Sequence, residues 1–307
     1  MSTAPTSSPA DANPDRLKAD LVLLFAALGW GSTFAINKAG LSYCSPNLYL
    51  ALRFTVGTLT AALLARRSLK HLPSLKAGFV LGLCLWLGFI LNMWGLKYTT
   101  ATRSGFITSL CVVLVPPLGA LVFRQRAHVS SWVGALLAGL GLTILAAPAL
   151  SSGGSVLGDA ITVASAVAYA FHLLLTARFA SKVVPFAAVT AQLAVVALLS
   201  ALCIPFEDVQ LRAEPPLLGI VLFTGVLCSA VFLFMQLWAQ ARTTAVRAAI
   251  LFSLEPIFAA LFAFLLLGDV LTAETWQGGA LILFGILIVE IWPRLVPART
   301  APAHPEG

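Results

Sequence analysis

The chain has 307 residues, of which 59% are hydrophobic and only 10% are charged, and its formal net charge is +7. Soluble globular domains carry about 25% charged residues, so this composition excludes a water-soluble fold and predicts an integral membrane protein with several spans. Because Lys and Arg gather on the cytoplasmic side of membrane proteins, topology explains the positive charge, and no nucleic-acid partner is predicted.

The first segment, 1–19, is rich in Ser, Pro and Ala and lacks an apolar core, so we expect a disordered tail and no signal peptide. Apolar segments then follow with short loops between them, each about as long as a membrane-spanning helix. There are ten: 20–39, 46–65, 77–97, 103–123, 129–148, 158–178, 184–204, 217–239, 247–267 and 273–292. A second tail follows at 293–307. We therefore expect an all-α integral membrane protein with ten transmembrane helices.

The basic residues are distributed unevenly across the loops. With the amino terminus in the cytoplasm, fourteen of the 19 Lys and Arg residues fall in predicted cytoplasmic segments, and Arg53 falls inside a span. The four on the opposite side are Lys38, Lys97, Arg103 and Arg212. This asymmetry predicts that both termini are cytoplasmic. We expect a multi-pass protein of the plasma membrane, which in a bacterium is the inner membrane.

Two parts of the chain resemble each other. A shift of 144 residues aligns 99–144 with the second half without gaps, and the pairs in and beside this stretch include Arg103 with Arg247, Asn92 with Gln236 and Trp94 with Trp238. The earlier part of each half needs a shift of 139, which pairs Asp20 with Asp159, Pro46 with Pro185 and Trp30 with Tyr169.

This similarity predicts two five-helix repeats, 20–148 and 158–292, joined by the loop 149–157. Because five is odd, the second repeat would enter the membrane from the opposite side. Secondary transporters often use such inverted repeats, with the solute site near the midplane between the halves. Gene duplication alone would explain the similarity, but it would not explain what the architecture is used for.

Two motifs carry a resemblance to a known family. The first span contains GWGSTFAINKA (29–39), and the ninth contains LEPIFAALFAFLLLGD (254–269), followed by Trp276, Gly278 and Gly279. With the duplication, these motifs resemble the two EamA-type halves of the drug/metabolite transporter superfamily over 20–292. The resemblance implies a ten-helix exporter or permease with a central cavity between the halves. Members of this family move amino acids and other small metabolites, often outward.

Glu255 and Pro256 interrupt an otherwise apolar span, and the first half has Cys111 and Val112 in their place. Glu255 lies about 12 Å from the cytoplasmic end of its helix, at 1.5 Å per residue. Pro256 removes a backbone donor and predicts a helix kink that frees the carbonyl near Phe252. Two interpretations stay open: a proton or ligand site, or a carboxylate paired with a neighbouring helix.

Three arginines invite two interpretations each. Arg53 lies within the second span and could pair with a carboxylate of the solute, or with backbone carbonyls or an acid such as Asp159. Arg103 and Arg247 lie near opposite membrane faces. They could act as a gate at each mouth of the cavity, or anchor helix starts at the interface.

Polar and aromatic residues within the spans complete the predicted solute site. The amides of Asn92 and Gln236 can both donate and accept hydrogen bonds, which suits a zwitterion or a hydroxylated solute. His172 could carry a proton, although it could equally donate to a carbonyl. The predicted solute-binding residues are Trp30, Arg53, Asn92, Trp94, Tyr169, His172, Gln236, Trp238 and Glu255.

The sequence predicts no enzyme, no cofactor and no metal site. It contains neither GxxxxGK[ST] nor HExxH, and its five cysteines include no CxxC pair. Gly268 and Asp269 match part of an intramembrane aspartyl protease motif, but no second intramembrane aspartate accompanies them. No catalytic residue is therefore expected.

The leading hypothesis is a secondary transporter that exports amino acids or related small metabolites by alternating access. The solute gradient or a proton gradient would drive it, with Glu255 and His172 as candidate proton carriers. The alternative is efflux of lipophilic cations, which would use a buried anion in an aromatic cavity. A non-transporting receptor or scaffold fits less well, because the loops are short. No oligomeric state is predicted.

Overall fold

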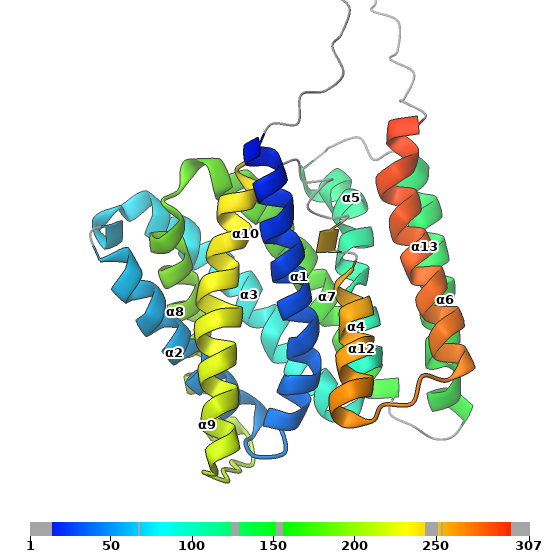
Figure 1. Ribbon diagram of the computed structural model, residues 1–307, viewed down its shortest axis with the longest axis horizontal. Helices are drawn as coiled ribbons and strands as arrows, with labels where there is room; N and C mark the ends of the chain where they lie inside the picture. Colours follow the sequence, from blue (N-terminus) through cyan, green and yellow to red (C-terminus); the bar gives the residue numbers. More distant parts are fainter. Residues whose placement is uncertain are drawn as a thin grey trace, which may run out of the picture.

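The computed structural model describes residues 14–66, 68–123, 129–151, 156–242, 251–252 and 254–295, and every named element in these ranges is a helix (Figure 1). Six of these helical segments are long and apolar enough to cross a bilayer: Leu17–Gly40, Pro46–Ala65, Leu72–Tyr98, Val156–Lys182, Pro185–Phe206 and Pro215–Gln240. Four apolar helices are shorter: Ala101–Val115, Trp132–Gly141, Glu255–Leu267 and Ala273–Ile288. A helix satisfies its backbone polar groups internally, as a hydrocarbon solvent requires. The chain is a multi-pass membrane protein.

The helices follow the order that the apolar segments predict. The first half contains α1 (Pro14–Gly40), α2 (Pro46–Ala65), α3 (Leu72–Tyr98), α4 (Ala101–Thr108), α5 (Leu110–Phe123) and α6 (Val129–Ser151). The second contains α7 (Val156–Phe179), α8 (Pro185–Cys203), α9 (Pro215–Leu222), a π-helix (Phe223–Val231), α10 (Phe232–Gln240), α12 (Glu255–Leu267) and α13 (Ala273–Leu295). Prolines begin α2, α8 and α9, because the first turn of a helix needs no amide donor there.

The helices of the bundle form two groups at opposite edges and a third group between them (Figure 1). Helices α6 and α13 lie side by side at one edge, and α2, α3 and α8 pack together at the other. Helices α1, α4, α7 and α12 lie between these edges. The first turn of α1 and the last turn of α13 lie at the same end of the bundle.

Three predicted spans differ from continuous α-helices. The fourth has a one-residue turn at Ser109, between α4 and α5, where the backbone keeps αR geometry and the Ser109 amide still donates to the carbonyl of Gly105. The eighth contains the π-helix. In the ninth, residues 251 and 252 are helical, Leu254 lies in a turn and α12 begins at Glu255, so Pro256, where a kink is expected, lies in the first turn of α12. A proline in a first turn removes a donor that would have had no intrahelical partner.

Close helix crossings depend on glycine. In the α6–α13 pair, a Cβ on Gly141 would lie 2.6 Å from the carbonyl oxygen of Gly278, and one on Gly285 would lie 2.7 Å from that of Gly134. Any larger residue at Gly141 or Gly285 would push the two backbones apart. Without a hydrophobic force between helices in lipid, such close van der Waals contact is a main source of association.

Carboxylates secure two helix starts at one end of the bundle. Glu207 accepts hydrogen bonds from the backbone amides of Asn47 and Leu48 at 3.0 and 3.1 Å, at the start of α2. Asp269 accepts from the backbone amide and hydroxyl of Thr102 at 3.2 and 2.9 Å, at the start of α4. A helix N-terminus carries unpaired amides and a partial positive charge, which an anion satisfies. Loops from the second half thus fix helices of the first.

Candidate functional site

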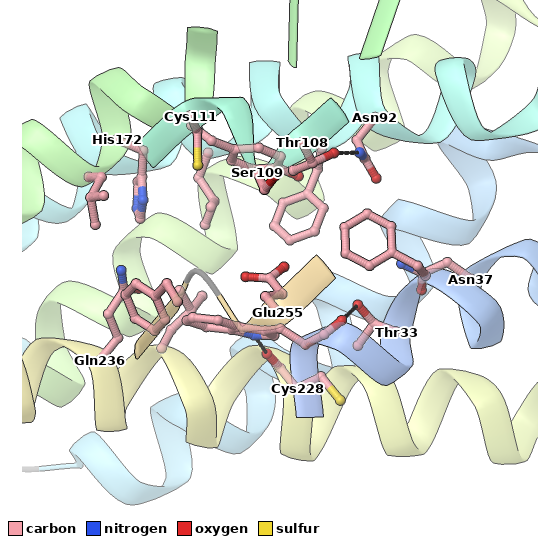
Figure 2. Close-up of a pocket in the computed structure, with 18 of the residues that line it drawn as sticks. Thr33, Asn37, Asn92, Thr108, Ser109, Cys111, His172, Cys228, Gln236 and Glu255 are labelled. Carbon is pink, nitrogen blue, oxygen red and sulfur yellow. Dashed lines mark hydrogen bonds between the residues drawn. The ribbon is translucent and has the colours of Figure 1, made fainter. Parts of the chain in front are cut away.

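A cavity of about 130 Å³ lies in the centre of the bundle, between helices of both halves (Figure 2). One water needs roughly 10–15 Å³ by the same measure, so the cavity has room for several waters or a compact solute. Its apolar lining comes from Trp30, Phe34, Leu85, Phe89, Val112, Tyr169, Leu173, Leu233 and Phe252. Its polar lining comes from Thr33, Asn37, Arg53, Asn92, Thr108, Ser109, Cys111, His172, Cys228, Gln236 and Glu255.

Helix α1 presents three cavity residues on one face. Trp30, Thr33 and Asn37 are spaced three and four residues apart, which places them above one another on a helix. The indole of Trp30 donates to the carbonyl oxygen of Cys228 at 2.8 Å, which ties α1 to the π-helix. The hydroxyl of Thr33 donates to its own helix, to the carbonyl oxygen of Trp30, at 2.7 Å.

Arg53 is the buried cation of the site, with 1% of its surface exposed. Its Nε donates to the hydroxyl of Ser229 at 3.0 Å, and one terminal nitrogen donates to Asn37 Oδ1 at 3.2 Å. Its guanidinium lies 5.0 Å from the ring centre of Phe89. Two of the five N–H groups are used in this way. Within the described ranges no carboxylate forms an ion pair with Arg53, so the predicted pairing with Asp159 is not observed.

Glu255 is the carboxylate of the site. It begins α12, and Figure 2 shows its carboxylate between two facing walls, with Cys111 and His172 on one and Cys228 and Gln236 on the other. Among the residues that the structure describes, no cation and no hydrogen-bond donor contacts its oxygens. The interpretation of Glu255 as half of a structural ion pair therefore finds no partner in the described ranges.

Three predicted polar residues also line the cavity. The amide nitrogen of Asn92 donates to the hydroxyl of Thr108 at 3.0 Å, which joins α3 to α4 (Figure 2). His172 Nε2 lies 3.1 Å from Gln192 Oε1 on α8, and the amide oxygen there makes the histidine nitrogen the donor. Gln236 projects from α10 and has no hydrogen-bond partner among the described residues, so its amide is available to a solute.

Two predicted solute-binding residues lie outside the lining. The ring of Trp94 is 5.1 Å from Lys97 Nζ, and the ring of Trp238 is 4.1 Å from the guanidinium carbon of Arg242. Lys97 lies in the last turn of α3, and Arg242 lies in the turn that follows α10. These contacts fit tryptophans at the membrane interface, where one side of the ring is apolar and the other is wet.

Arg103 lies in a cluster of polar contacts at the end of the bundle where α4 begins. It forms an ion pair with Asp159 of α7, whose carboxylate also accepts from the hydroxyl of Thr99 at 2.8 Å. Lys38 Nζ donates to the carbonyl oxygen of Thr99 at 2.7 Å and so ties α1 to the end of α3. The predicted counterpart, Arg247, lies outside the described residues.

Sequence reasoning missed several polar cavity residues. Asn37, Thr33, Thr108 and Ser109 all line the cavity, yet hydroxyls and amides are common in membrane helices and carry no charge to mark them. One signal was present: Thr33 and Asn37 lie three and seven residues after Trp30, which places them on the same helix face. Among the described residues, no group of three or more His, Cys, Asp or Glu side chains could hold a metal ion.

Comparison with known proteins gives matches over nearly the whole chain. The model of the EamA-like transporter family matches residues 17–147 and again 156–291. An uncharacterized transporter of Archaeoglobus fulgidus is 31% identical over 90% of this chain and 87% of its own length. The uncharacterized transporter YdfC of Bacillus subtilis is 24% identical over 84% of this chain and 86% of its own.

A solved crystal structure is similar to this chain in fold. It has a TM-score of 0.68, covers 92% of this chain and 99% of its own, and shares 20% sequence identity.

Proposed function

The chain belongs to the EamA-like transporter family, and from this premise we propose that it is a secondary transporter that exports amino acids or related small metabolites by alternating access. One observation carries the proposal. A central cavity between the halves contains a carboxylate, Glu255, with no partner among the described residues, and a guanidinium, Arg53, with N–H groups to spare. Buried charges are costly unless paired, and a zwitterionic solute would pair both.

The proposed architecture is ten membrane crossings in two inverted five-helix repeats, 20–148 and 158–292, with both termini in the cytoplasm of a cell whose plasma membrane holds the protein. The α6–α13 crossing supports it. Gly141 packs on Gly278 and Gly285 packs on Gly134, and both pairs exchange under the 144-residue shift. A two-fold axis between the repeats would produce this reciprocal contact.

Turns at Ser109 and Leu254 interrupt the fourth crossing of each half, and their position beside the cavity supports a transport mechanism. Helix α5 begins at Leu110 and α12 begins at Glu255. The 144-residue shift places the equivalent of Leu110 at Leu254, so the two helix starts agree to within one residue. Discontinuous helices at the midplane of secondary transporters place their N-termini and loosened backbone at the solute site. Ser109 and Glu255 both line the cavity at these turns.

The contacts of the site suit an amino acid. Glu255 would accept from the ammonium, Arg53 would donate to the carboxylate, and the amides of Asn92 and Gln236 would complete the polar contacts. The apolar lining would contact the side chain of the solute. If transport is coupled to protons, Glu255 and His172 are the groups of the cavity that could carry them.

The Arg103 cluster is proposed as the gate at one mouth. The ion pair of Arg103 with Asp159 joins α4 to α7, and Lys38 joins α1 to α3. Opening that mouth would require these helices to separate and the pair to hydrate. Arg247 is proposed to serve the opposite mouth, because the 144-residue shift makes it equivalent to Arg103.

Efflux of lipophilic cations is the second candidate, and the same carboxylate favours it. Glu255 lies in a cavity whose aromatic rings include Trp30, Tyr169 and Phe252. A desolvated carboxylate among aromatic faces attracts an organic cation. The two candidates differ in what they require of Arg53, which would repel a cation and bind an amino acid.

Solute counterflow in proteoliposomes tests the proposal, because it needs no imposed ion gradient. Labelled amino acids, a sugar and tetraphenylphosphonium are offered to the wild type and to Glu255→Gln. We expect the wild type to exchange at least one amino acid and the variant to exchange it at least tenfold more slowly. Exchange of tetraphenylphosphonium alone would favour the second candidate. Exchange of none of these solutes by a folded wild-type protein would contradict the proposal.

A further inference from the structure

The π-helix Phe223–Val231 is best understood by aligning it with α3, the equivalent helix of the first half. Gly82 of α3 packs closely on α8, and Gly225 of the π-helix packs closely on α2 in the equivalent way. A Cβ on Gly82 would lie 2.9 Å from the carbonyl oxygen of Gln192, and one on Gly225 would lie 2.6 Å from that of Arg53. Gln192 and Arg53 are equivalent under the 139-residue shift, so Gly82 corresponds to Gly225 with an offset of 143.

The offset changes within two turns. A Cβ on Gly88 would lie 2.5 Å from the ring of Tyr169, and Phe232 packs edge to face on Trp30 with ring centres 6.2 Å apart. Trp30 and Tyr169 are equivalent under the 139-residue shift, so Gly88 corresponds to Phe232 with an offset of 144. One residue has therefore been inserted between Gly225 and Phe232. The π-helix Phe223–Val231 spans that interval, and a π-turn is how a helix absorbs one extra residue.

The insertion changes the hydrogen bonds around Arg53. The hydroxyl of Ser229 donates to the carbonyl oxygen of Thr224, five residues earlier, at 2.9 Å. Its oxygen then accepts from Arg53 Nε at 3.0 Å. Thr224 Oγ1 lies 3.2 Å from the hydroxyl of Tyr49, which also donates to Asn37 at 2.7 Å. Ser229 and Asn37 thus hold the guanidinium from two sides.

The first half has no such arrangement. Helix α3 is a continuous α-helix, and Gln192 occupies the place of Arg53 and contacts His172 instead. The cavity is therefore asymmetric where the two halves would otherwise match. The asymmetry coincides with the inserted residue, and π-helical turns occur frequently at functional sites.

We propose that the inserted residue in Phe223–Val231 is the specificity-determining element of the cavity. It sets Ser229 against Arg53 Nε, and the unused N–H groups of the guanidinium are thereby held toward the cavity to bind a solute carboxylate. Ser229 is a positioning residue, since it acts through Arg53. The inference rests on the proposed function, because it takes the central cavity to be the solute site.

L-leucine and L-leucinamide form the probe pair. Both carry an ammonium group and the same apolar side chain, and they differ only in the carboxylate. Dissociation constants are measured for the purified protein in detergent from the dependence of Tm on ligand concentration. The preference is the ratio of the leucinamide constant to the leucine constant. We expect a preference of about tenfold or more in the wild type, as a charge-assisted hydrogen bond supplies.

Three variants separate positioning from charge. Ser229→Ala should lower the preference about three- to tenfold, Arg53→Lys should lower it by a similar factor because the fork is lost, and Arg53→Gln should abolish it. Ser200→Ala is the matched control: this buried serine of α8 has no hydrogen-bond partner among the described residues, so the preference should not change. Deletion of Val226 should restore a continuous α-helix, as α3 has, and remove the preference.

The outcomes are decisive in each direction. A wild type with no preference for leucine, or a preference that survives both Ser229→Ala and a folded Val226 deletion, overturns the inference. If the deletion variant does not fold, Ser229→Ala alone decides. Counterflow keeps the proposed function separate: a wild type that exchanges leucine while Ser229→Ala leaves the preference unchanged would retain the function and lose the inference. If the variants lower the preference but the wild type exchanges no solute, the inference is retained and the proposed function is lost.

Discussion

The two halves match at the α6–α13 crossing and differ in the charged residues of the cavity. The glycines of the α6–α13 crossing correspond under one shift and make reciprocal contacts. At the cavity, Glu255 of the second half corresponds to Cys111 of the first, and Arg53 of the first half corresponds to Gln192 of the second. Close backbone packing tolerates little change, whereas a cavity wall can change chemistry without moving the helices. The charged residues of the cavity therefore differ between the halves, whereas the close glycine contacts of the α6–α13 crossing are shared.

The largest effect should come from Glu255→Gln. Removing the carboxylate takes away the partner of the solute ammonium, so we expect counterflow of the transported amino acid to fall about tenfold to a hundredfold, as loss of a charge-assisted contact implies. Stability should not fall, because no described residue pairs with this carboxylate. Cys111→Ser, the equivalent position of the first half, should change counterflow less than twofold. Equal effects at both positions would show that the halves are functionally alike.

The next effect concerns Asp159. Asp159→Asn removes the ion pair with Arg103 and leaves that arginine largely buried, with 15% of its side chain exposed. We expect the free energy of unfolding to fall by about 2 kcal/mol, somewhat less than for a fully buried pair. Thermal unfolding in detergent measures it. The double variant Arg103→Gln/Asp159→Asn should recover part of the loss, and a double variant as unstable as the sum of the single ones would argue against a direct pair.

Glycine packing gives a smaller effect on stability. Gly141→Ala would place a methyl group 2.6 Å from a backbone carbonyl, and we expect a loss of about 1–3 kcal/mol from the forced separation of α6 and α13. A Cβ on Gly139, two residues away on the same helix, would have nothing within 4 Å of it. Gly139→Ala should therefore leave Tm unchanged or raise it slightly. Equal loss in both variants would contradict the close crossing.

The smallest effects distinguish the tryptophans. Trp30→Phe removes the hydrogen bond to the carbonyl of Cys228 in the cavity wall, and the KM for the transported solute should rise a few-fold. Trp94→Phe and Trp238→Phe should change it less than twofold, because neither ring lines the cavity. A larger effect at Trp94 than at Trp30 would restore the prediction from sequence that Trp94 contacts solute.

Much of the fold followed from the sequence because lipid imposes a simple rule. Apolar stretches of membrane length must be helical, and the repeated motifs placed them in order. The turn at Ser109 and the π-helix were not predictable in this way. Both lie inside predicted spans, and hydrophobic patterning indicates that a span is helical without specifying where its backbone hydrogen bonding changes.

The candidate site was predicted in part for a related reason. Charged and large polar residues within spans are rare, so each was recognised individually, and seven of the predicted residues line the cavity: Trp30, Arg53, Asn92, Tyr169, His172, Gln236 and Glu255. Trp94 and Trp238 are also large residues with a polar group in predicted spans, but they lie near helix ends. Ser229 carried no signal, because its role depends on the extra residue that turns it toward Arg53.

Access to the cavity from both sides is the central claim, and Cys111 gives a direct measurement of it. This residue lines the cavity, and a protein that keeps it as the only cysteine can be labelled with a membrane-impermeant maleimide in right-side-out and inside-out vesicles. The account predicts labelling from both sides, with protection by the transported solute in each case. Labelling from one side only, or labelling that no solute affects, would contradict alternating access at this cavity.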